Sequence, residues 1–545
     1  MPTGRLKLEG WAKLMALYPD SEVTSAIMGI CKYGVRIGYE GIREEPTIYP
    51  NLATAEADID LVTADIEYEL SLDRLHTYPN QDSLPTHYTA SPLGLTDKSD
   101  GSKRRIHHLS YPTTGTSSIN AGIPEEYGTI AYSGINDAIL AIQNMGTGSL
   151  LVKRDFESAF RHIPVSPLDS PLLGFQWQGR YYSECFLPFG LRTAPYLFNL
   201  FSEAPHWILQ EELGTQELPG RIIHYLDDFL IVIPPDSDPA NYTRVFAKLC
   251  TELGLSIKES KNKEGTMVDF AGVELDTRRM VIRLPIKKLL KGREIVDSTI
   301  EKKSISLLEL QQITGYLTFA STVVPLGRTF LRRLYNLQIY FPPGRGHQRR
   351  RISSEAHKDL AWWAEVLSDT PQRSTAPHTR ETICTWSDAA STKGLGAYFT
   401  SPAQPYPQPD SVLSIALPYL ATQANEHINT QEMRAVEQIL LYWGRSWEGK
   451  RIVMHTDNRA VFYGLAKGTI RGASMTVLRR CLLLATEYDL ELQPIWISTN
   501  ENALADALSR FDHDRVTNLA PQLLSQSCNL PNHGLRTYSN RDYQQ

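Results

Sequence analysis

Two adjacent aspartates, Asp227 and Asp228, stand between two strongly apolar runs, and this feature constrains the fold more than any other. Residues 222–223 precede them, and residues 229–233 follow before two prolines end the second run. Apolar strands joined by a short polar turn predict a β-hairpin with carboxylates at its tip. Like charges there are costly unless a cation shares them, so the pattern favours a divalent-metal site. Taken alone, a solvated Asp-Asp turn is the simpler interpretation.

Two segments upstream change that judgement. A short apolar strand, residues 151–154, ends at a third aspartate, Asp155, and an acid at the end of a central strand can reach the tip of an adjacent hairpin. Between the two sites, a Pro-Phe-Gly turn with Phe189 leads into a helix that follows Arg192. Backbone N–H groups and a guanidinium at such a turn suit a phosphate or a template strand.

In order and spacing, these three segments resemble the palm motifs of reverse transcriptases. The resemblance implies that Asp155 and Asp227 are the principal ligands of two Mg²⁺ or Mn²⁺ ions, with Asp228 in support. It also implies that Phe160 collides with a ribose 2′-hydroxyl and so favours dNTPs over rNTPs. An ordinary core phenylalanine is the alternative for Phe160. The implied reaction extends a DNA primer on an RNA or DNA template.

Further matches surround the palm segments. Residues 91–106 resemble the family's fingers hairpin, which would place Lys98 and Arg104 at the triphosphate of the incoming nucleotide. A solvated hairpin charge is the alternative for each. Lys261 matches a lysine proposed in the family to protonate pyrophosphate, although two other lysines within three residues are close rivals.

A capping box at Ser306 and Glu309 predicts the start of a helix. Along one face of that helix, Gln311, Gly315 and Phe319 recur every four residues. The stretch resembles the thumb helix of reverse transcriptases, which implies contact with a nucleic-acid minor groove. Ordinary helix packing is the alternative for the glycine and the phenylalanine. Clusters of arginine downstream favour contact with phosphates without sequence choice.

Four more acids follow a polar, proline-containing segment, residues 370–380, which we interpret as a linker. They are Asp388, Glu432, Asp457 and Asp506. Three lie at strand ends or helix starts and one in a facing helix, which suits a two-metal nuclease. Their order resembles that of ribonuclease H, which implies two metal ions on these residues and cleavage of the RNA strand of an RNA–DNA hybrid. The loop 497–501 lacks the histidine that many ribonucleases H use.

These matches predict an α+β and α/β multidomain chain: a right-hand polymerase of fingers, palm and thumb, followed by a ribonuclease H-like domain. The predicted divisions are an N-terminal helical extension packed on the fingers (1–85), fingers and palm (86–285), thumb and connection (286–370), the ribonuclease H-like domain (371–515) and a flexible tail (516–545). Details around the aspartate box look most like retrotransposons of the DIRS type.

Composition adds three expectations. The net charge of −6 is unusual for a nucleic-acid binder, but the acids gather in two sites and the basic residues in fingers and thumb. Six scattered cysteines favour a reducing intracellular compartment, cytoplasm or nucleus, and no apolar run predicts membrane contact. Because no protease or recombinase pattern is found, we expect capsid-like and recombinase or integrase partners from the same element.

Two other functions stay open on the sequence. A scaffold that only binds RNA predicts loss of the catalytic acids, as does a decayed copy. An RNA-dependent RNA polymerase predicts a smaller or polar residue at position 160 and no nuclease domain. The chain keeps Phe160 and every acid named above, so we predict a reverse transcriptase with ribonuclease H.

Overall fold

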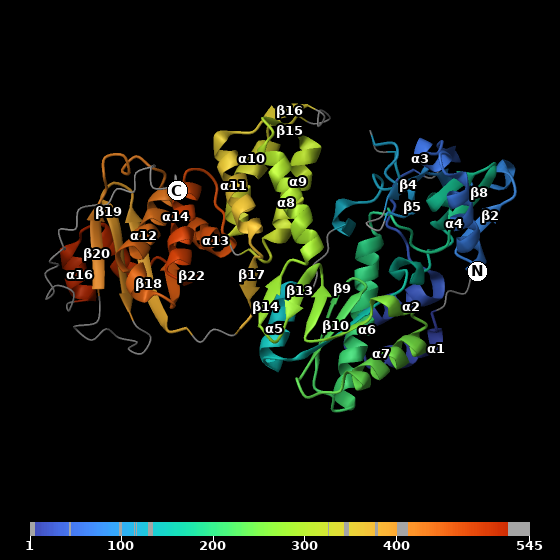
Figure 1. Cartoon of the computed structure of the whole chain (residues 1–545), viewed down its shortest axis with the longest axis horizontal. Helices are drawn as coiled ribbons and strands as arrows, with labels where there is room; N and C mark the ends of the chain where they lie inside the picture. Colours follow the sequence, from blue (N-terminus) through green and yellow to red (C-terminus); the bar gives the residue numbers. More distant parts are fainter. Residues whose placement is uncertain are drawn as a thin grey trace. The chain divides into compact units, whose positions relative to one another are not determined.

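The computed structural model describes residues 6–42, 45–97, 101–113, 115, 117–128, 134–324, 326–342, 348–376, 380–400 and 413–520, so Lys98 lies outside the described residues. The chain is a mixed α/β multidomain protein (Figure 1). It forms two compact units: residues 1–285 with 372–376, and residues 286–371 with 377–545.

An antiparallel four-stranded sheet is the centre of the first unit. Its strand order is β11 (Lys263–Gly265), β6 (Leu150–Asp155), β10 (Asp228–Ile233) and β9 (Arg221–Tyr225). Residues 229–233 of β10 are all buried, which explains why this strand is apolar throughout rather than alternating. The predicted hairpin is confirmed, since β9 and β10 pair antiparallel on either side of residues 226–227.

Three further sheets complete the strands of this unit. The first has the order β1 (Thr47–Ile48), β3 (Thr89–Ala90), β7 (Gly174–Trp177), β8 (Arg180–Glu184) and β2 (Leu75–Tyr78). The second is the hairpin of β4 (Leu93–Asp97) and β5 (Lys103–His107). The third has the order β12 (Met267–Phe270), β13 (Val273–Asp276), β14 (Val281–Arg283) and β17 (Gln372–Ser374).

Strand β17 corrects the interpretation of residues 370–380 as a plain linker. It pairs antiparallel with β14, the edge strand of its sheet, and so returns to the first unit. An edge strand carries unpaired backbone N–H and C=O groups, and a short extended segment satisfies them whatever its side chains are. Polar composition alone could not reveal that pairing.

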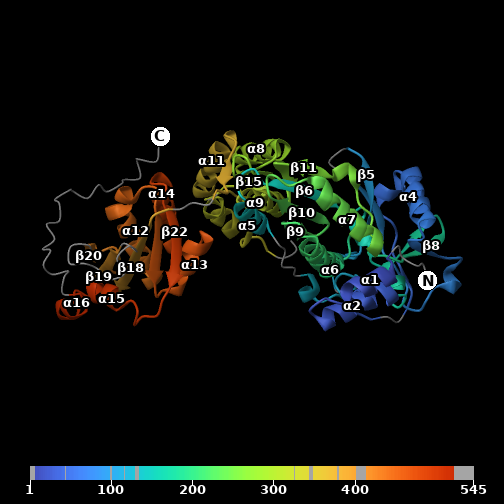
Figure 2. The same ribbon diagram turned by 90° about the horizontal axis from the view of Figure 1, so that it is seen from below.

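The helices of the first unit surround these sheets. They are α1 (Leu8–Met15), α2 (Ser21–Tyr33), α3 (Ala53–Glu56), α4 (Ile59–Ser71), α5 (Ile135–Met145), α6 (Ala194–Thr215) and α7 (Pro239–Leu253). The N-terminal extension was predicted to pack on the fingers, and the contacts of α1 show where its first helix lies. That helix contacts α6 and α7 (Figure 2). Trp11 fixes it there: its ring is fully buried, and its Nε1–H donates to the Leu253 carbonyl oxygen at 3.0 Å.

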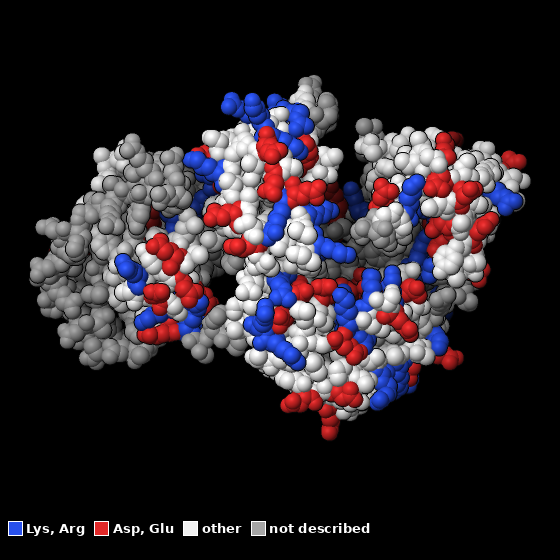
Figure 3. Space-filling view, in the orientation of Figure 1, with Lys and Arg blue, Asp and Glu red and all other residues white. Residues whose placement is uncertain are grey.

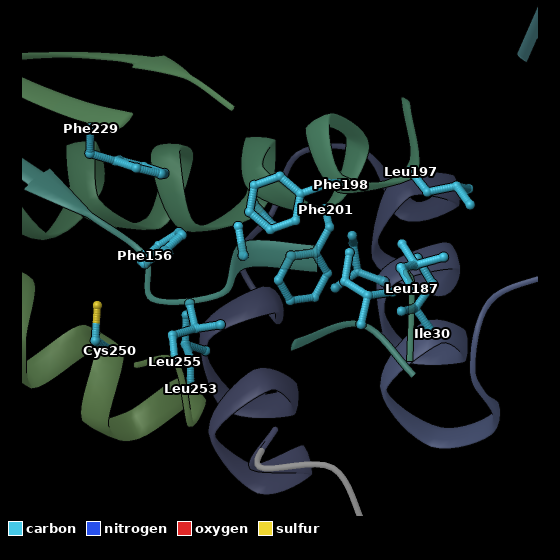
Figure 4. Packing of buried hydrophobic residues seen from close by; sticks show 14 of the residues in the cluster. Ile30, Phe156, Leu187, Leu197, Phe198, Phe201, Phe229, Cys250, Leu253 and Leu255 are labelled. Carbon is cyan, nitrogen blue, oxygen red and sulfur yellow. The ribbon is translucent and has the colours of Figure 1, made fainter. Parts of the chain in front are cut away.

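One hydrophobic core joins α1, α2, α6 and α7 to the central sheet. Phe156 and Phe229 lie with ring centroids 5.0 Å apart, and Phe246 of α7 stacks on Phe156 at 5.9 Å. Figure 4 shows Phe156 and Phe229 on neighbouring strands, with Phe198 and Phe201 of α6 beside them. The residue after Asp155 and the residue after Asp228 are thus both anchored in the core, which fixes the strand ends that carry the acids.

The second unit begins with a helical region. It contains α8 (Ile286–Ile300), α9 (Leu307–Ala320), α10 (Arg332–Gln338), α11 (Ser354–Ser368) and the strand pair β15 (Ser304–Ser306) and β16 (Arg349–Arg351). The predicted capping box is confirmed: Ser306 accepts from the Glu309 backbone N–H, and Glu309 accepts from the Ser306 backbone N–H at 2.8 Å.

A five-stranded mixed sheet follows in the second unit. Its order is β20 (Leu413–Pro418), β19 (Gly394–Thr400), β18 (Thr382–Ala390), β21 (Arg451–Thr456) and β22 (Glu491–Trp496). Its helices are α12 (Ile428–Trp443), α13 (Arg459–Lys467), α14 (Ser474–Glu487), α15 (Ala503–Ser509) and α16 (His513–Leu519). Ala397 packs with the core of α12 and α14, and Tyr398 packs with α15 and α16. Because successive strand residues point to opposite faces, helices cover both faces of this sheet.

Helix α16 shortens the flexible tail predicted from residue 516. Asp512 caps the helix by accepting from the Arg515 backbone N–H at 3.1 Å, and Val516 is buried against Ala507 and Leu508. One apolar contact and one cap stabilise a helix too short to show a periodic pattern. Residues 521–545 lie outside the described residues.

Among the helices that the structure describes, none combines the length and the apolar character needed to cross a lipid bilayer.

Candidate active sites

The turn between β9 and β10 holds the first acidic cluster in a strained conformation. Tyr225 and Asp228 are register partners, so Leu226 and Asp227 form a two-residue turn. Leu226 has φ 54°, in the left-handed region that such turns reserve for glycine or asparagine. A side chain there costs about 1–3 kcal/mol. The buried strands on either side hold the turn in place despite that cost.

The sheet register brings the predicted acids together. Asp155 of β6 lies directly opposite Asp228 of β10, and Asp227 occupies the turn beside them. Opposite residues of an antiparallel pair share one face, with Cβ atoms about 4.5–5.5 Å apart. Burial, opposed by a hydrogen bond from Lys153, raises the pKa of Asp228 to about 6. Burial and the charge of Asp155 raise the pKa of Asp227.

Two lysines already act as cations in this cluster. The Nζ of Lys261 donates to both carboxylate oxygens of Asp155, at 3.0 and 2.8 Å. The Nζ of Lys153 lies 2.9 Å from Asp228 Oδ1. Lys261 was predicted from its motif, whereas Lys153 was missed. Its signal was available, because a residue two positions before Asp155 in a strand points to the same face.

The charged groups of this cluster suit metal ions. Three carboxyl groups converge at one end of the sheet, and two positive charges already compensate them. Carboxylate oxygens are the ligands that Mg²⁺ and Mn²⁺ prefer. The residues therefore fit divalent cations.

A buried arginine behind the cluster was also missed. Arg154 is 2% exposed and donates to Glu264 Oε1 and Thr243 Oγ1. Successive strand residues face opposite ways, so Arg154 points away from the acids. Its ion pair with Glu264 joins β6 to β11 and fixes the strand that presents Asp155.

Three of the predicted substrate residues lie together. The ring of Phe160 lies 5.2 Å from that of Phe189 and 5.6 Å from that of Phe198. The guanidinium of Arg104, in strand β5, lies 5.3 Å from the Phe189 ring centre, and Phe189 is 44% exposed. Phe160 is half-buried, so it is an accessible ring with a packed support rather than a fully enclosed core residue.

Arg192 lies elsewhere. Its Nη1 donates to the Ile123 carbonyl oxygen at 2.9 Å, and its backbone N–H donates to Asn120 at 2.8 Å. Its side chain lines a separate cavity of about 900 Å³ with Tyr39 and His87. The role predicted for Arg192 at a phosphate or template strand stays a prediction.

The predicted minor-groove face of α9 is open. Gln311 and Gly315 are exposed, and a Cβ added at Gly315 would have no described heavy atom within 4 Å. Phe319 is partly exposed beneath Lys288, whose Nζ lies 4.4 Å from the ring centre. No described side chain of this unit packs closely enough on Gly315 to require a glycine there. This favours contact with a molecule outside the chain over ordinary helix packing.

Basic side chains gather beyond this helix. Figure 3 shows Lys and Arg over β15 and β16, and β16 consists of three consecutive arginines, residues 349–351. A cavity of about 700 Å³ is lined there by Arg350, Arg351 and Tyr340. The surface can contact phosphates without reading a base sequence.

The second acidic cluster lies on the five-stranded sheet. Asp388 of β18, Glu432 of α12 and Asp457 after β21 each offer a carboxylate oxygen within 4.8 Å of the others. Burial raises the pKa of Asp388 to about 6, and burial with the charge of Asp388 raises the pKa of Glu432 well above its ordinary value. Glu432 Oε2 is buried with no hydrogen-bond partner among the described residues. These oxygens also fit divalent cations.

Asp506 lies at the edge of this cluster. Burial alone would raise its pKa, but hydrogen bonds from Arg510 and Arg515 lower it. Its carboxylate is thus engaged by arginines, with Arg510 Nε at 2.6 Å. Its charge still contributes to the raised pKa of Asp388.

Three supporting residues of this cluster were missed. Ser509 Oγ donates to Asp388 Oδ2 at 2.6 Å, and Asn502 Nδ2 donates to Asp457 Oδ1 at 3.2 Å. Burial and the charge of Glu432 raise the pKa of Tyr419, which places its hydroxyl near the acids. Ser509 and Asn502 lie within four residues of Asp506, so the motif around that acid could have predicted them. No sequence motif contains Tyr419.

Residues 105–275 match the model of the reverse transcriptase (RNA-dependent DNA polymerase) family. The first acidic cluster and Phe160 lie inside that match. This segment is therefore similar to reverse transcriptases and to the Pol polyproteins of retroviruses and retrotransposons.

Relatives of known identity share modest similarity. The Pro-Pol polyprotein of feline foamy virus is 26% identical over 224 residues, 38% of this chain and 17% of that protein. The enzymatic polyprotein of figwort mosaic virus is 20% identical over 392 residues, 66% of this chain and 50% of that protein. The Pol polyprotein of the Drosophila melanogaster transposon gypsy is 25% identical over 125 residues, 23% of this chain and 11% of that protein. The chain spans half or less of the length of each relative.

Two solved structures are similar to this chain at low sequence identity. A foamy viral protease-reverse transcriptase with double-stranded DNA is 16% identical with a TM-score of 0.46, covering 90% of this chain and 97% of that one. The same kind of protein with an RNA/DNA hybrid is 13% identical with a TM-score of 0.45, covering 89% of this chain and 62% of that one.

Proposed function

We propose that this protein is a reverse transcriptase that extends a DNA primer with dNTPs on an RNA or DNA template. One observation carries the proposal: Asp155 and Asp228 face each other across a sheet with Asp227 in the turn beside them, inside the segment that matches the family. A surface turn would not be supported by two fully buried phenylalanines directly behind its acids.

Asp155 and Asp227, supported by Asp228, would hold two Mg²⁺ or Mn²⁺ ions. When bound, such ions lower the pKa of the attacking 3′-hydroxyl and stabilise the charge of the leaving pyrophosphate. Lys261 holds a proton beside Asp155, where it could pass to the pyrophosphate. Arg104 and, by sequence, Lys98 would bind the triphosphate.

The residues around Phe160 would select the sugar. Its ring is supported by Phe189 and Phe198, so it cannot move aside freely when a ribose 2′-hydroxyl approaches. Steric exclusion of that hydroxyl favours dNTPs. The open face of α9, with Gln311, Gly315 and Phe319, would follow the minor groove of the product duplex.

The second cluster supports a ribonuclease H activity in the same chain. Asp388, Glu432 and Asp457 would bind two metal ions with Asp506, once Arg510 and Arg515 release it, and cleave the RNA strand of RNA–DNA hybrids. Helices on both faces of a mixed five-stranded sheet suit that assignment. We assign the chain to a DIRS-type retrotransposon, in which capsid-like and recombinase or integrase proteins would be its partners.

Two assays test these activities separately. Purified protein with dNTPs and Mg²⁺ should extend a DNA primer on an RNA template, and Asp227→Asn with Asp228→Asn should not. Cleavage of a preformed hybrid should survive those changes and be lost in Asp457→Asn. Failure of the wild-type chain to extend primers while it still binds the primer–template would leave a nucleic-acid-binding scaffold as the function.

A further inference from the structure

A second kind of ligand set lies behind the catalytic hairpin, apart from both acidic clusters. Glu203 and His206 are three residues apart on α6 and share a helix face, and His224 faces them from β9. One ligand atom from each lies within 4.8 Å of the other two. The proposed polymerase and nuclease steps use none of the three.

The contacts within this set leave a buried nitrogen without a hydrogen bond. The Nδ1 atoms of His206 and His224 are 2.7 Å apart. The other nitrogen of His224, Nε2, has no hydrogen-bond partner among the described residues, and Glu203 Oε1 lies 3.7 Å from it. His224 is 2% exposed, so water does not readily compensate this atom. The ring thus presents one nitrogen to each of the other two side chains.

The chemistry of the set suits a transition metal rather than Mg²⁺. Two imidazoles and one carboxylate are ligands typical of Zn²⁺. Metal ions bind a ring nitrogen that carries no proton, and Nε2 of His224 has no hydrogen-bond partner among the described residues. The carboxylate also leaves a negative charge for a cation to compensate.

One ion can take only one nitrogen of His224, and Nε2 is the one without a hydrogen bond, so the His206 ring must turn from Nδ1 of His224 toward the Glu203 side to join the site. Zinc bonds of about 2.0–2.1 Å in a tetrahedron place ligand atoms about 3.3 Å apart. The side chain of Glu203 is 46% exposed and His206 is half-buried, so both can rotate while His224 stays fixed. His224 stacks on Phe229 with centroids 5.3 Å apart, and Phe229 packs on Phe156.

We infer that Glu203, His206 and His224 form a Zn²⁺ site that ties α6 to the strand leading into the catalytic hairpin. Three protein ligands leave a fourth position for water on the exposed Glu203 side. The bound ion stabilises the fold around Leu226 and Asp227 by linking His224, and with it Phe229, to a long helix. The inference does not depend on which polymer the chain copies.

Zinc retention tests this site directly. The full chain is stripped with a chelator, given Zn²⁺, desalted and analysed for metal per protein. The carboxylate clusters can also take up zinc, so the decisive number is the difference between variants. Wild type should retain one equivalent more than His206→Ala. Loss of a ligand should weaken zinc binding at least about 100-fold, since even outer-shell changes cost about 10–100-fold.

A conservative variant and a matched control keep the test interpretable. Glu203→Gln changes a half-exposed side chain and should fold normally while losing about 10-fold or more in zinc affinity. Glu211→Gln, an exposed carboxylate on the same helix, should bind zinc like wild type. Co²⁺ in place of Zn²⁺ should give the strong visible absorption of a four- or five-coordinate ion in wild type and Glu211→Gln only.

Thermal melting gives a readout independent of metal analysis. Zinc should raise the melting temperature of wild type and Glu211→Gln more than that of His206→Ala, in which only the carboxylate clusters can take up the ion, because a metal bound to the folded state stabilises it. Equal zinc content in wild type, His206→Ala and Glu203→Gln would overturn the site. So would a wild-type chain that retains no zinc after desalting, which would make the three side chains a hydrogen-bonded chain without metal.

Discussion

The two acidic clusters compensate their charge in opposite ways. In the first, Lys261 and Lys153 each contact a carboxylate at hydrogen-bonding distance. In the second, no ion pair involves Asp388 or Glu432 within the part of the chain that the structure describes, and both carboxyl groups have raised pKa values. The first cluster therefore compensates its charge from within, whereas in the second only Asp506 has arginine partners, and Asp388 and Glu432 depend on protons or metal ions.

The two clusters would therefore bind metal ions in different ways. A metal entering the first cluster must compete with two ammonium groups, which ties its binding to movement of the lysines. A metal entering the second cluster meets buried carboxyl groups with raised pKa values, so its binding releases more protons as the pH falls toward those values. The same ligand chemistry thus leads to different dependences on charge and on pH.

The largest effect should come from removing one acid at each site. Asp155→Asn should lower primer extension by about 10³-fold and spare hybrid cleavage, and Asp388→Asn should do the reverse. A lost metal site removes several kcal/mol of transition-state stabilisation, and each 1.36 kcal/mol is about tenfold in rate. Both rates are measured on both variants under single-turnover conditions. Loss of both activities from one substitution would contradict two independent sites.

A smaller effect is expected at the residue that would select the sugar of the incoming nucleotide, and only in the polymerase site. Phe160→Ala should reduce the preference for dNTPs over rNTPs by about 10- to 100-fold, the range for one steric contact in a binding pocket. The ratio of kcat/KM for a dNTP and its rNTP measures it. Hybrid cleavage serves as the control and should not change. An unchanged ratio would return Phe160 to an ordinary packing role.

The unfolding free energy tests whether Lys153 compensates the charge of the first cluster. Lys153→Met should lower the unfolding free energy of the metal-free protein by about 1–3 kcal/mol, less than the full cost of breaking a buried pair because both groups are partly exposed. Lys263→Met is the control, since its pair with Asp269 is exposed and worth at most about 1 kcal/mol. Denaturant unfolding measures both. Equal losses would mean that Lys153 does not compensate the cluster.

The smallest effect is a pH dependence at the second cluster. A carboxyl group with a raised pKa in the folded state destabilises the fold above that pKa, and the penalty fades as pH falls through it. Asp388, with a pKa of about 6, should therefore penalise the metal-free protein more at pH 7 than at pH 5. Asp388→Asn should stabilise the protein at pH 7, and this gain should shrink by about 1 kcal/mol at pH 5.

Asp228→Asn provides the comparison for that measurement. The pKa of Asp228 is also about 6, but its replacement leaves Lys153 without its carboxylate. We expect no gain in stability at pH 7 from this variant. Similar gains from Asp228→Asn and Asp388→Asn would show that the lysine does not distinguish the two clusters.

Local patterns predicted the acids and the elements that carry them. The hairpin at Asp227, the strand ending at Asp155 and the capping box at Ser306 follow from alternation, apolar runs and backbone chemistry that a few residues determine. The roles assigned to these residues came from the resemblance and stay predictions. Lys153 could have been predicted by the same strand periodicity that places Asp155.

Contacts between distant segments could not be predicted from one sequence. Strand β17 pairs through backbone groups, which leave no trace in its side chains. Trp11 holds α1 on α7 by a hydrogen bond to Leu253, which is 242 residues away in the sequence. Tyr419 reaches the second cluster only because β20 joins the edge of the sheet. In each case tertiary packing, rather than local propensity, decides the position.

One measurement tests the central claim most directly: simultaneous observation of both strands during primer extension on an RNA template, with the DNA primer and the RNA carrying different labels. With dNTPs and Mg²⁺, the account predicts that the DNA lengthens while the newly copied RNA behind it is cut, and that Asp227→Asn stops the lengthening but still cuts the RNA already paired with the primer. No lengthening of DNA by wild-type protein that demonstrably binds the primer–template would contradict the account.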